Sequence, residues 1–577
     1  MPKRSGAVHV VTTTRHYKDK VYQSHLLCRS YREGPRVRKE TVGNLSHLPA
    51  PIIALIRRAL RGDPLVSADQ FEIVRSQPHG DGHAVRTAMD RLGFARLLSA
   101  RRCREADLVT AMVAARVIAP HTKLATTRWW QTQTLADDLG VREASEDDLY
   151  AAMDWLLAHQ DRIEGRLAAR HLAPGGLVLY DLTSSYFEGT TCPLAKRGHN
   201  RDGKRNKLQV NYGLVTDGRG RPVAVSVFAG NVADPTTLLP QVHRLRERLG
   251  IQHVVLVGDR GMISQKSIDE LQRMEGMVWI TALKSPQIQK LLTSGALQLG
   301  LFDERNLFEL TDPAFPGERL MACRNAALAT RRAHTRQALL AATTRDLEKI
   351  QQRVARGRLH GRAEIGLRVG RVINHYKVAK HFAVTITETA LHWTLRTTRI
   401  ETEAALDGLY LIRTNAPAAT LSAADAVRHY KALSHVERAF RSLKTLDLHV
   451  RPIHHRLADR VRSHIFLCML AYYVEWHLRE AWRPLLFADE DQQAKATRDP
   501  VAPATRSAAA DQKAATHQLA DGTPVHSFRT LLQDLSAIVR NECRTPGHGD
   551  DAPTFTVTTT PTPEQRRAFE LLNGIAV

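Results

Sequence analysis

The alternation of apolar and polar residues changes character along the first third of the chain. In residues 1–50, short runs of alternating apolar and polar positions are separated by charged or Gly/Pro turns, a pattern typical of β-strands. In residues 51–172, apolar residues recur every three or four positions, which predicts helices. Short apolar runs return after Gly175. The pattern therefore predicts a β-rich start, a helical region and then an α/β region.

The runs after Gly175 follow a recognisable order. Three strand-like runs, LVLYDLTSSYF, LQVNYGLVTD and PVAVSVFAG, are predicted to form an antiparallel meander. A helix, a strand, a second helix and the strand VWITALK come next. This is the element order of the ribonuclease H-like fold, a mixed α/β sheet flanked by helices. We therefore predict an α/β core of this class.

The sheet pattern is interrupted from Ser285 to about Leu406 and resumes at LYLIRTN. The interruption has a helical stripe and strand-like runs of its own, which predicts an inserted subdomain. A strong helix is expected from about Ser422 to Thr445. Residues 489–517 are rich in Ala, Thr, Gln and charged residues, which predicts a flexible linker.

Composition limits the classes of binding partner and the cellular compartment that suit the protein. Lys and Arg number 82 against 59 Asp and Glu, and the net charge of +23 favours a polyanion such as nucleic acid, although it also suits ribosomal and membrane-surface proteins. The start has no apolar signal region, and the best apolar run, Ile465 to Val474, is too short to span a bilayer. None of the six cysteines forms a CxxC-type pair. We expect a cytoplasmic, nucleoid-associated protein without a membrane partner.

Two acids stand in or at the end of apolar strands. Asp181 lies inside the first run, where a carboxylate is costly unless something compensates it. Asp259 ends the strand HVVLVGD, at the position where α/β folds place ligands. Taken alone, each acid could equally be a structural hydrogen-bonded residue or a turn residue.

A third acid, Glu437, lies on the helix expected between Ser422 and Thr445. Tyr430, Glu437 and Lys444 are spaced by seven and share one face of that helix. Arg438 and Arg441 are close by in sequence, and an acid flanked by cations suits a site that binds both metal and phosphate. A surface ion pair between residues four apart would explain the same spacing.

Three carboxylates from separate elements suit one particular chemistry. Cleavage and rejoining of phosphodiesters are in-line displacements, which two metal ions about 3.5–4 Å apart can assist at the incoming and leaving oxygens. Mg²⁺ prefers carboxylate oxygens and keeps several water molecules. Two Mg²⁺ or Mn²⁺ ions held by Asp181, Asp259 and Glu437 are therefore expected.

With these three acids in this order, the sequence resembles the DDE transposases of bacterial insertion sequences, in the family-four group marked by a Tyr–Arg–Glu–Lys signature. The order of the three acids matches, and Tyr430, Glu437 and Lys444 occupy signature positions. The Arg position of the signature holds Leu433, so Arg438 or Arg441 would have to take its phosphate-binding role. Further resembling stretches are YDLTSSYFEG, GHNRDGKRNKLQVNYGL, FAGNVADPTTL, VGDRGMIS and RPIHHRLADRVRSHI.

The resemblance implies a transposase that binds the terminal inverted repeats of its element, cleaves the DNA ends and joins them to target DNA. It also implies a homodimer in the synaptic complex and leaves a hairpin intermediate open. Two alternatives stand beside it: a ribonuclease H-fold nuclease acting on structured nucleic acid, and an inactive DNA-binding relative.

Other residues are candidates for contacts with DNA. The loop after the first strand carries Lys204, Arg205 and Lys207, which could follow a DNA backbone or simply be a solvated charge run. The resemblance suggests that Trp393 stacks on a flipped base, although a Trp in the core of the subdomain is an equal interpretation. Asp234 before Pro235 is expected to cap a helix.

The predicted domains follow from these patterns. They are a β-rich segment (1–50), a helical and DNA-binding region (51–172), the first part of the ribonuclease H-like core (173–284), the inserted subdomain (285–407), the second part of the core with the catalytic Glu helix (408–484), and a flexible linker with a small tail (485–577).

Overall fold

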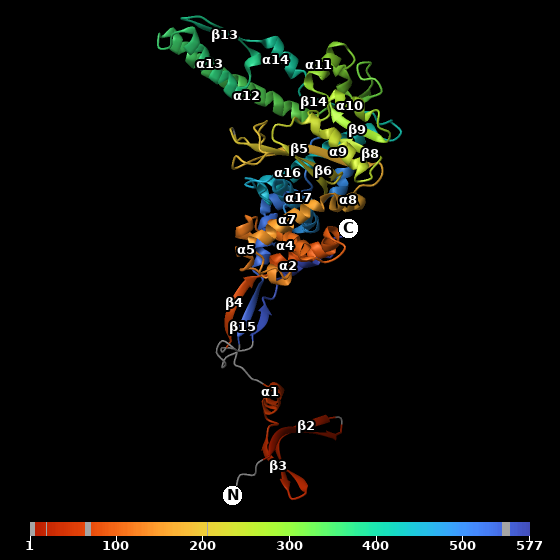
Figure 1. Cartoon of the computed structure of the whole chain (residues 1–577), viewed down its shortest axis with the longest axis vertical. Coiled ribbons are helices and arrows are strands. Elements are labelled where there is room, and N and C mark those ends of the chain that lie inside the picture. Colours follow the sequence, from red (N-terminus) through yellow and green to blue (C-terminus); the bar gives the residue numbers. More distant parts are fainter. Residues whose placement is uncertain (1–5, 19, 64–70, 205, 545–553, 577) are drawn as a thin grey trace. The chain divides into compact units, whose positions relative to one another are not determined.

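The computed structural model describes residues 6–18, 20–63, 71–204, 206–544 and 554–576. Their contacts divide the chain into two compact units (Figure 1). The smaller unit joins Met1–Gln77 to Val539–Thr559, and the larger joins Pro78–Ile538 to Thr560–Val577. Among the described residues, every helix is too short or too polar to cross a membrane.

The smaller unit contains the strands predicted in the first 50 residues. They pair in sequence order as an antiparallel sheet of β1 (Ala7–Tyr17), β2 (Lys20–Glu33) and β3 (Arg36–Asn44). The helix α1 (Ala50–Leu60) packs on β1. A second sheet has the order β16 (Thr554–Thr558), β15 (Val539–Arg544), β4 (Glu72–Pro78), so strands from both ends of the chain meet there.

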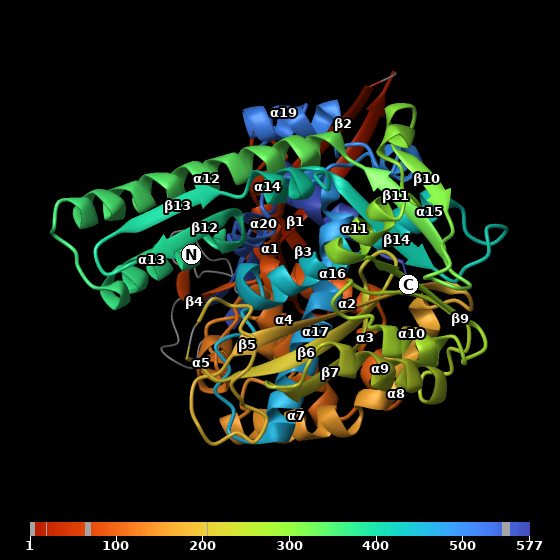
Figure 2. The ribbon, with the colours of Figure 1, turned by 90° about the horizontal axis from the view of Figure 1, so that it is seen from above.

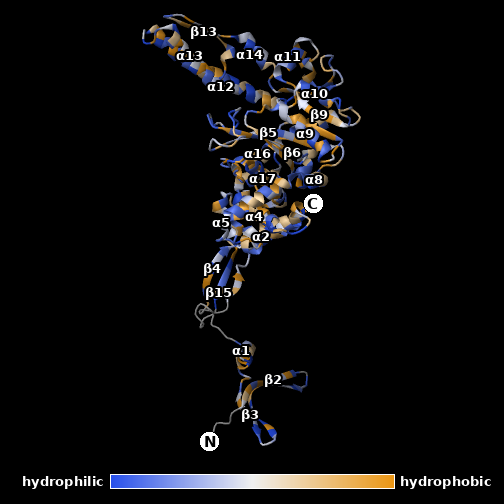
Figure 3. Cartoon of the chain, viewed as in Figure 1, coloured by the Kyte–Doolittle hydropathy of each residue, from blue (hydrophilic) through white to orange (hydrophobic). Residues whose placement is uncertain are grey.

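An eight-stranded mixed sheet forms the centre of the larger unit, which confirms the predicted ribonuclease H-like class. Strand β5 pairs antiparallel with β6 on one side and parallel with β8 on the other. The order across the sheet is β10 (Leu307–Leu310), β11 (Arg319–Arg324), β14 (Leu409–Thr414), β9 (Met277–Ala282), β8 (Val254–Val257), β5 (Gly176–Tyr186), β6 (Gln209–Asp217), β7 (Pro222–Ala229). In Figure 3 hydrophobic residues concentrate in strands such as β8 and β9.

Helices pack against this sheet. The apolar run noted above lies in α17 (Ala458–Ala481), which is buried along most of its length and packs on α4 (Arg104–Ile118), α7 (Glu146–Ala158) and β7. The remaining helices of this unit outside the insertion are α2 (Gly80–Arg91), α3 (Phe94–Leu98), α5 (Lys123–Trp130), α6 (Leu135–Asp138), α8 (Gln160–His171), α9 (Pro235–Glu247), α10 (Gln265–Leu271), α11 (Ser285–Thr293), α15 (Ala423–Lys431), α16 (Leu433–Arg441), α18 (Gln492–Thr497), α19 (Ala508–Thr516), α20 (Phe528–Ser536) and α21 (Pro563–Leu572).

The insertion leaves the sheet later than the sequence predicts. Strands β10 and β11 lie inside the predicted interruption but belong to the main sheet, and their four and six residues are too few to stand out as a pattern. The part outside the sheet is α12 (Ala326–Ala355), α13 (Arg362–Tyr376), β12 (Phe382–Ile386), β13 (Leu391–Leu395) and α14 (Thr397–Ala404). Figure 2 shows α12, α13 and the two strands projecting together, and they share a small core of their own.

The prediction of a flexible linker at residues 489–517 is wrong. Two short helices, α18 and α19, occupy it, and Ser507 donates to Asp489 at 2.8 Å. Lys513 is buried and donates to the carbonyl of Pro484 at 3.0 Å and to Glu490. These polar contacts order a segment whose composition alone is too hydrophilic to predict packing.

Candidate active site

The first two predicted acids lie on neighbouring segments of the sheet: Asp181 is in β5, and Asp259 stands two residues past the end of β8. In the parallel pair of β5 and β8, Leu179 stands opposite Val257. Asp181 and Asp259 each follow that pair by two residues, so they reach the same level of the sheet. Neighbouring strands are about 4.8 Å apart, which brings the two carboxylates to one edge. The register of the sheet thus joins two acids that are far apart in sequence.

Asp181 is the more enclosed of the two. One of its oxygens accepts a hydrogen bond from the backbone N–H of Leu182 at 2.8 Å. Burial, together with the negative charges of Asp259 and Glu437, raises the pKa of Asp181 to about 7, against the lowering effect of the Leu182 N–H and Arg201. All three predicted acids therefore interact electrostatically.

The third acid, Glu437, is carried by α16, which packs on β5. A neighbouring face of α16 is buried through Val436 and Phe440, and the Phe440 ring meets that of Tyr212 on β6 at 5.9 Å between centroids. Packing of that face fixes the helix on the sheet and leaves Glu437 exposed beside it.

The helix predicted from Ser422 to Thr445 is broken into three pieces. Helix α15 ends at Lys431, α16 runs from Leu433 to Arg441, and a π-helical turn follows at Ser442–Leu446. The Ser442 hydroxyl donates to the buried carboxylate of Glu475, which also accepts from Arg479 at 2.6 Å. These contacts hold the turn and end the regular helix, a tertiary effect that periodicity cannot predict.

Tyr430 contacts an acid of the site. Its hydroxyl donates to Asp259 at 3.2 Å. Burial raises the pKa of Tyr430 above its usual range, and the carboxylate of Asp259 raises it further. The phenol is therefore a neutral donor that orients Asp259.

Lys444 is held by an acid that the sequence did not single out. Its ammonium donates to Asp202 at 2.9 Å, and Arg451 also pairs with Asp202. The other oxygen of Asp202 accepts from the backbone N–H of Tyr186 at 2.9 Å, at the end of β5. Asp202 thus connects the basic loop, β5 and the end of the Glu437 helix. In the sequence it is one charge among many in GHNRDGKRNK, so no local signal marks it.

Other predicted residues lie around this centre. Arg438 and Arg441 are exposed on α16, and Arg438 lines a cavity of about 660 Å³ together with Trp476. Leu433 is buried, so it offers no polar group for a phosphate. Trp393 is half-buried against Phe382, with ring centroids 5.9 Å apart, inside the core of the insertion.

In the basic loop, Lys204 is exposed and Lys207 pairs with Glu188 at 2.8 Å, while Arg205 lies outside the described residues. The prediction that Asp234 caps α9 is wrong: its side chain makes no capping hydrogen bond and pairs instead with Arg201. A neighbouring cation competes successfully for the carboxylate.

The donor set of the three acids suits a hard divalent cation. Carboxylate oxygens are the ligands that Mg²⁺ and Mn²⁺ prefer, and a cation would relieve the repulsion that raises the pKa of Asp181. Within the part of the chain that the structure describes, no three His, Cys, Asp or Glu side chains are gathered closely enough to hold a metal ion. In the described part of the chain, the three acids therefore do not form a closed set of metal ligands.

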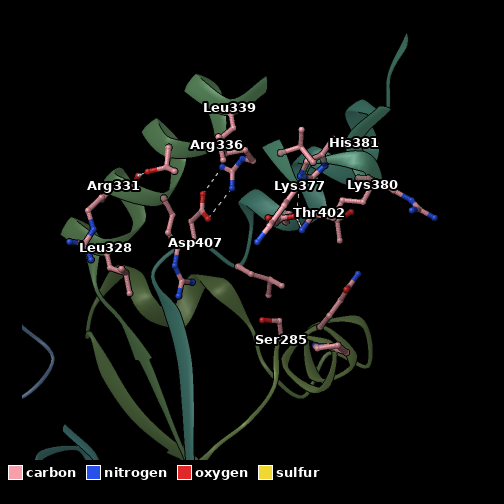
Figure 4. A pocket seen from close by; sticks show the side chains of 18 of the residues that line it. Ser285, Leu328, Arg331, Arg336, Leu339, Lys377, Lys380, His381, Thr402 and Asp407 are labelled. Carbon is pink, nitrogen blue, oxygen red and sulfur yellow. Dashed lines mark hydrogen bonds and ion pairs between the residues drawn. The ribbon is translucent and has the colours of Figure 1, made fainter. Parts of the chain in front are cut away.

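A basic cavity of about 1120 Å³ lies at the base of the insertion (Figure 4). Helices α12 and α14, the segment after α13 and the start of α11 form its walls. Its two acids, Asp407 and Glu403, pair with Arg336 and Lys380. Arg260, directly after Asp259, also lines it, and sequence analysis missed this residue because only the fold turns it toward the insertion. The lining cations are Arg260, Arg331, Arg332, Arg336, Lys377, Lys380 and Arg399.

Comparisons with known proteins identify the family of the chain. A family model described as "Transposase DDE domain" matches residues 174–474, more than half of the chain and the part that holds the three acids. A second, "IS1634 family transposase, N-terminal domain", matches residues 10–69. A search of curated proteins finds no match. Among solved structures, the chain is similar to a piggyBac transposase in a synaptic complex with hairpin DNA, at 9% identity and a TM-score of 0.32, over 79% of this chain and 77% of that one.

Proposed function

Because the chain belongs to the family of transposases with a DDE domain, we propose that Asp181, Asp259 and Glu437 are its catalytic acids. The enzyme cleaves DNA and transfers strands. The observation that carries the assignment is that Asp181 and Asp259 each stand two residues past the last pair of β5 and β8, together with the raised pKa of Asp181 to which both other acids contribute.

The proposed cofactors are two Mg²⁺ or Mn²⁺ ions held by the three carboxylates. When bound, such ions activate the attacking oxygen and stabilise the leaving oxygen of an in-line displacement. The chain's own groups prepare the site: the Leu182 N–H fixes Asp181, and the hydroxyl of Tyr430 fixes Asp259. Water and then a 3′-hydroxyl are the nucleophiles, so no covalent intermediate with the protein is needed.

The proposed DNA substrates are the terminal inverted repeats of an insertion sequence and a target duplex. The cations of the cavity at the base of the insertion and the loop with Lys204, Arg205 and Lys207 carry the charge that phosphates require. Arg438 and Arg441 flank Glu437 and extend this surface. The N-terminal segment and the helical region read the DNA ends, and the active assembly is a homodimer.

Replacement of Asp181 tests the proposal. Asp181→Asn keeps the volume and the contact with Leu182 but removes a charge that metal binding needs, so cleavage should be lost while binding to the terminal repeats stays. Glu188→Gln is the matched control, because Glu188 is an acid near the end of the same strand whose partner is Lys207. Gel-shift and cleavage assays on one DNA compare the three proteins. Wild-type cleavage by Asp181→Asn, or equal loss of cleavage and binding, would contradict the assignment.

A further inference from the structure

A second basic cavity, of about 880 Å³, lies away from the three acids. It is formed by the end of α4, the start of α5 and the segment 449–457 that leads into α17. Five of its lining residues are Lys or Arg and five are His, and none is Asp or Glu. Such a composition is unusual for a concave surface, because like charges in a cavity repel one another.

Two of these cations are buried without a carboxylate partner. Lys123 is 5% exposed and Arg116 is 7% exposed. Among the described residues, neither has an acid within ion-pair distance, and Arg116 donates only to the carbonyl of His121 at 3.1 Å. The other enclosed cations of the cavity differ, since Arg451 pairs with Asp202 and Arg460 lies 3.6 Å from Asp154.

The pKa values of ionisable groups in the cavity reflect the burial of these cations. Burial, together with the charge of Arg116, lowers the pKa of Lys123 to about 7. Burial also lowers the pKa of His455 to about 3, with contributions from Lys123 and Arg116. A cation buried without a counter-charge is unfavourable, and at both groups the nearby cations add to the effect of burial.

Lys513 is a second buried lysine of this chain, and it has a carboxylate partner. It is 6% exposed, as enclosed as Lys123, but it contacts the carboxylate of Glu490 and the carbonyl of Pro484. The contrast indicates that Lys123 is placed for a negative partner from outside the chain.

The backbone adds to the positive character of the cavity. Helix α5 begins at Lys123, and its cap residue Thr122 accepts from the N–H of Ala125 at 3.2 Å. Thr122 and Lys123 line the cavity at this helix start, where the positive end of the helix dipole lies. Phosphate groups bind at helix starts of this kind when cationic side chains are added.

We propose that this cavity binds a phosphate group, which Lys123, Arg116 and the start of α5 hold. The proposal goes beyond DNA cleavage at the three acids and does not depend on their assignment. A metal ion does not suit the cavity, because the surrounding cations would repel it. The phosphate comes either from the DNA backbone or from a free phosphate-containing molecule, and the two sources can be separated by experiment.

Inorganic phosphate is the probe. The melting temperature of the full chain is measured in phosphate and in chloride at equal ionic strength, and the apparent Kd is taken from the phosphate dependence. The wild type should be stabilised by millimolar phosphate. Lys123→Met should bind at least tenfold more weakly, whereas Lys123→Arg and the matched control Lys513→Met should keep the wild-type Kd. If Lys123→Met fails to fold, Arg456→Ala at the exposed rim should weaken binding severalfold.

Duplex DNA with the element's end then identifies the source. If the DNA stabilises the wild type more than the Lys123 variant and removes the phosphate response, the ligand is a backbone phosphate. If the response persists with DNA bound, the ligand is a free phosphate. The proposal is overturned if phosphate and DNA each stabilise Lys123→Met as much as the wild type. Because the first arm uses neither DNA nor cleavage, its result is independent of the catalytic assignment.

Discussion

Asp202 is the residue whose loss should disturb the site most without touching a proposed metal ligand. Its side chain is 1% exposed and accepts from Lys444, Arg451 and the backbone N–H of Tyr186. Asp202→Asn keeps an oxygen for the Tyr186 N–H but removes the charge that both cations share. Lys444 and Arg451 would then face each other, largely enclosed, with no carboxylate between them.

The magnitude follows from the burial of the three groups. Removing one partner of a buried ion pair costs about 3–5 kcal/mol, because the other charge stays buried and unpaired. The side chains of Lys444 and Arg451 are 11% and 18% exposed, so some solvation remains and the lower end of that range applies. We expect Asp202→Asn to lower the free energy of unfolding of the larger unit by about 3 kcal/mol.

Urea unfolding with an unchanged m-value measures this loss. A double-mutant cycle with Lys444→Met should give a coupling of about 1–3 kcal/mol, because the two side chains are in contact. Glu188→Gln is the control, and it should change little because the pair with Lys207 is exposed. A loss below about 1 kcal/mol for Asp202→Asn, or additive effects in the cycle, would refute this view of Asp202.

Three further predictions concern pH, rate and salt. Burial raises the pKa of Asp81 to about 6, so the folded state keeps a proton that the unfolded state releases and stability falls as pH rises from about 4 to 6. Asp81→Asn should therefore be more stable than the wild type at pH 8, by up to about 3 kcal/mol, and equal near pH 4, and a pH-independent difference in urea melts would contradict this. Tyr430→Phe loses the contact with Asp259 and should slow single-turnover cleavage about fivefold at unchanged DNA affinity, whereas a weaker gel shift at full rate would assign Tyr430 to the DNA. Replacing Lys204 and Arg205 with Ala should flatten the slope of log K against log salt by up to about two units, and an unaltered slope would make the loop a solvated charge run.

Patterns within short segments predicted much of this fold. The strands β5, β6 and β7 alternate or are apolar throughout, and the apolar run in α17 is long and unbroken, so local sequence identifies them. Strands β10 and β11 were not predicted, because strands of only a few residues at the edge of a sheet show little periodicity in the sequence. For this reason the insertion begins at Ala326 in the structure, later than the Ser285 predicted from the sequence.

In the candidate site, too, local sequence predicted some features and missed those that depend on tertiary packing. Asp181, Asp259 and Glu437 could be chosen because their positions, taken as a set, match the acid order of the DDE transposases that the sequence resembles. The roles of Tyr430 and Lys444 could not, since the seven-residue spacing placed them on one face of a helix that is in fact interrupted. Their partners, Asp259 and Asp202, come from other elements, and only the packed sheet brings them within hydrogen-bond distance.

Binding of Mn²⁺ to the protein with cleaved-end DNA tests the central claim most directly. Electron paramagnetic resonance titrations count the bound ions in the wild type and in Asp181→Asn, Asp259→Asn and Glu437→Gln, with Glu188→Gln as the control. The account predicts two ions in the wild type and the control, and loss or marked weakening of at least one in each of the three variants. Wild-type Mn²⁺ binding in any of the three, in a complex that still holds its DNA, would contradict the assignment of that acid to the metal site.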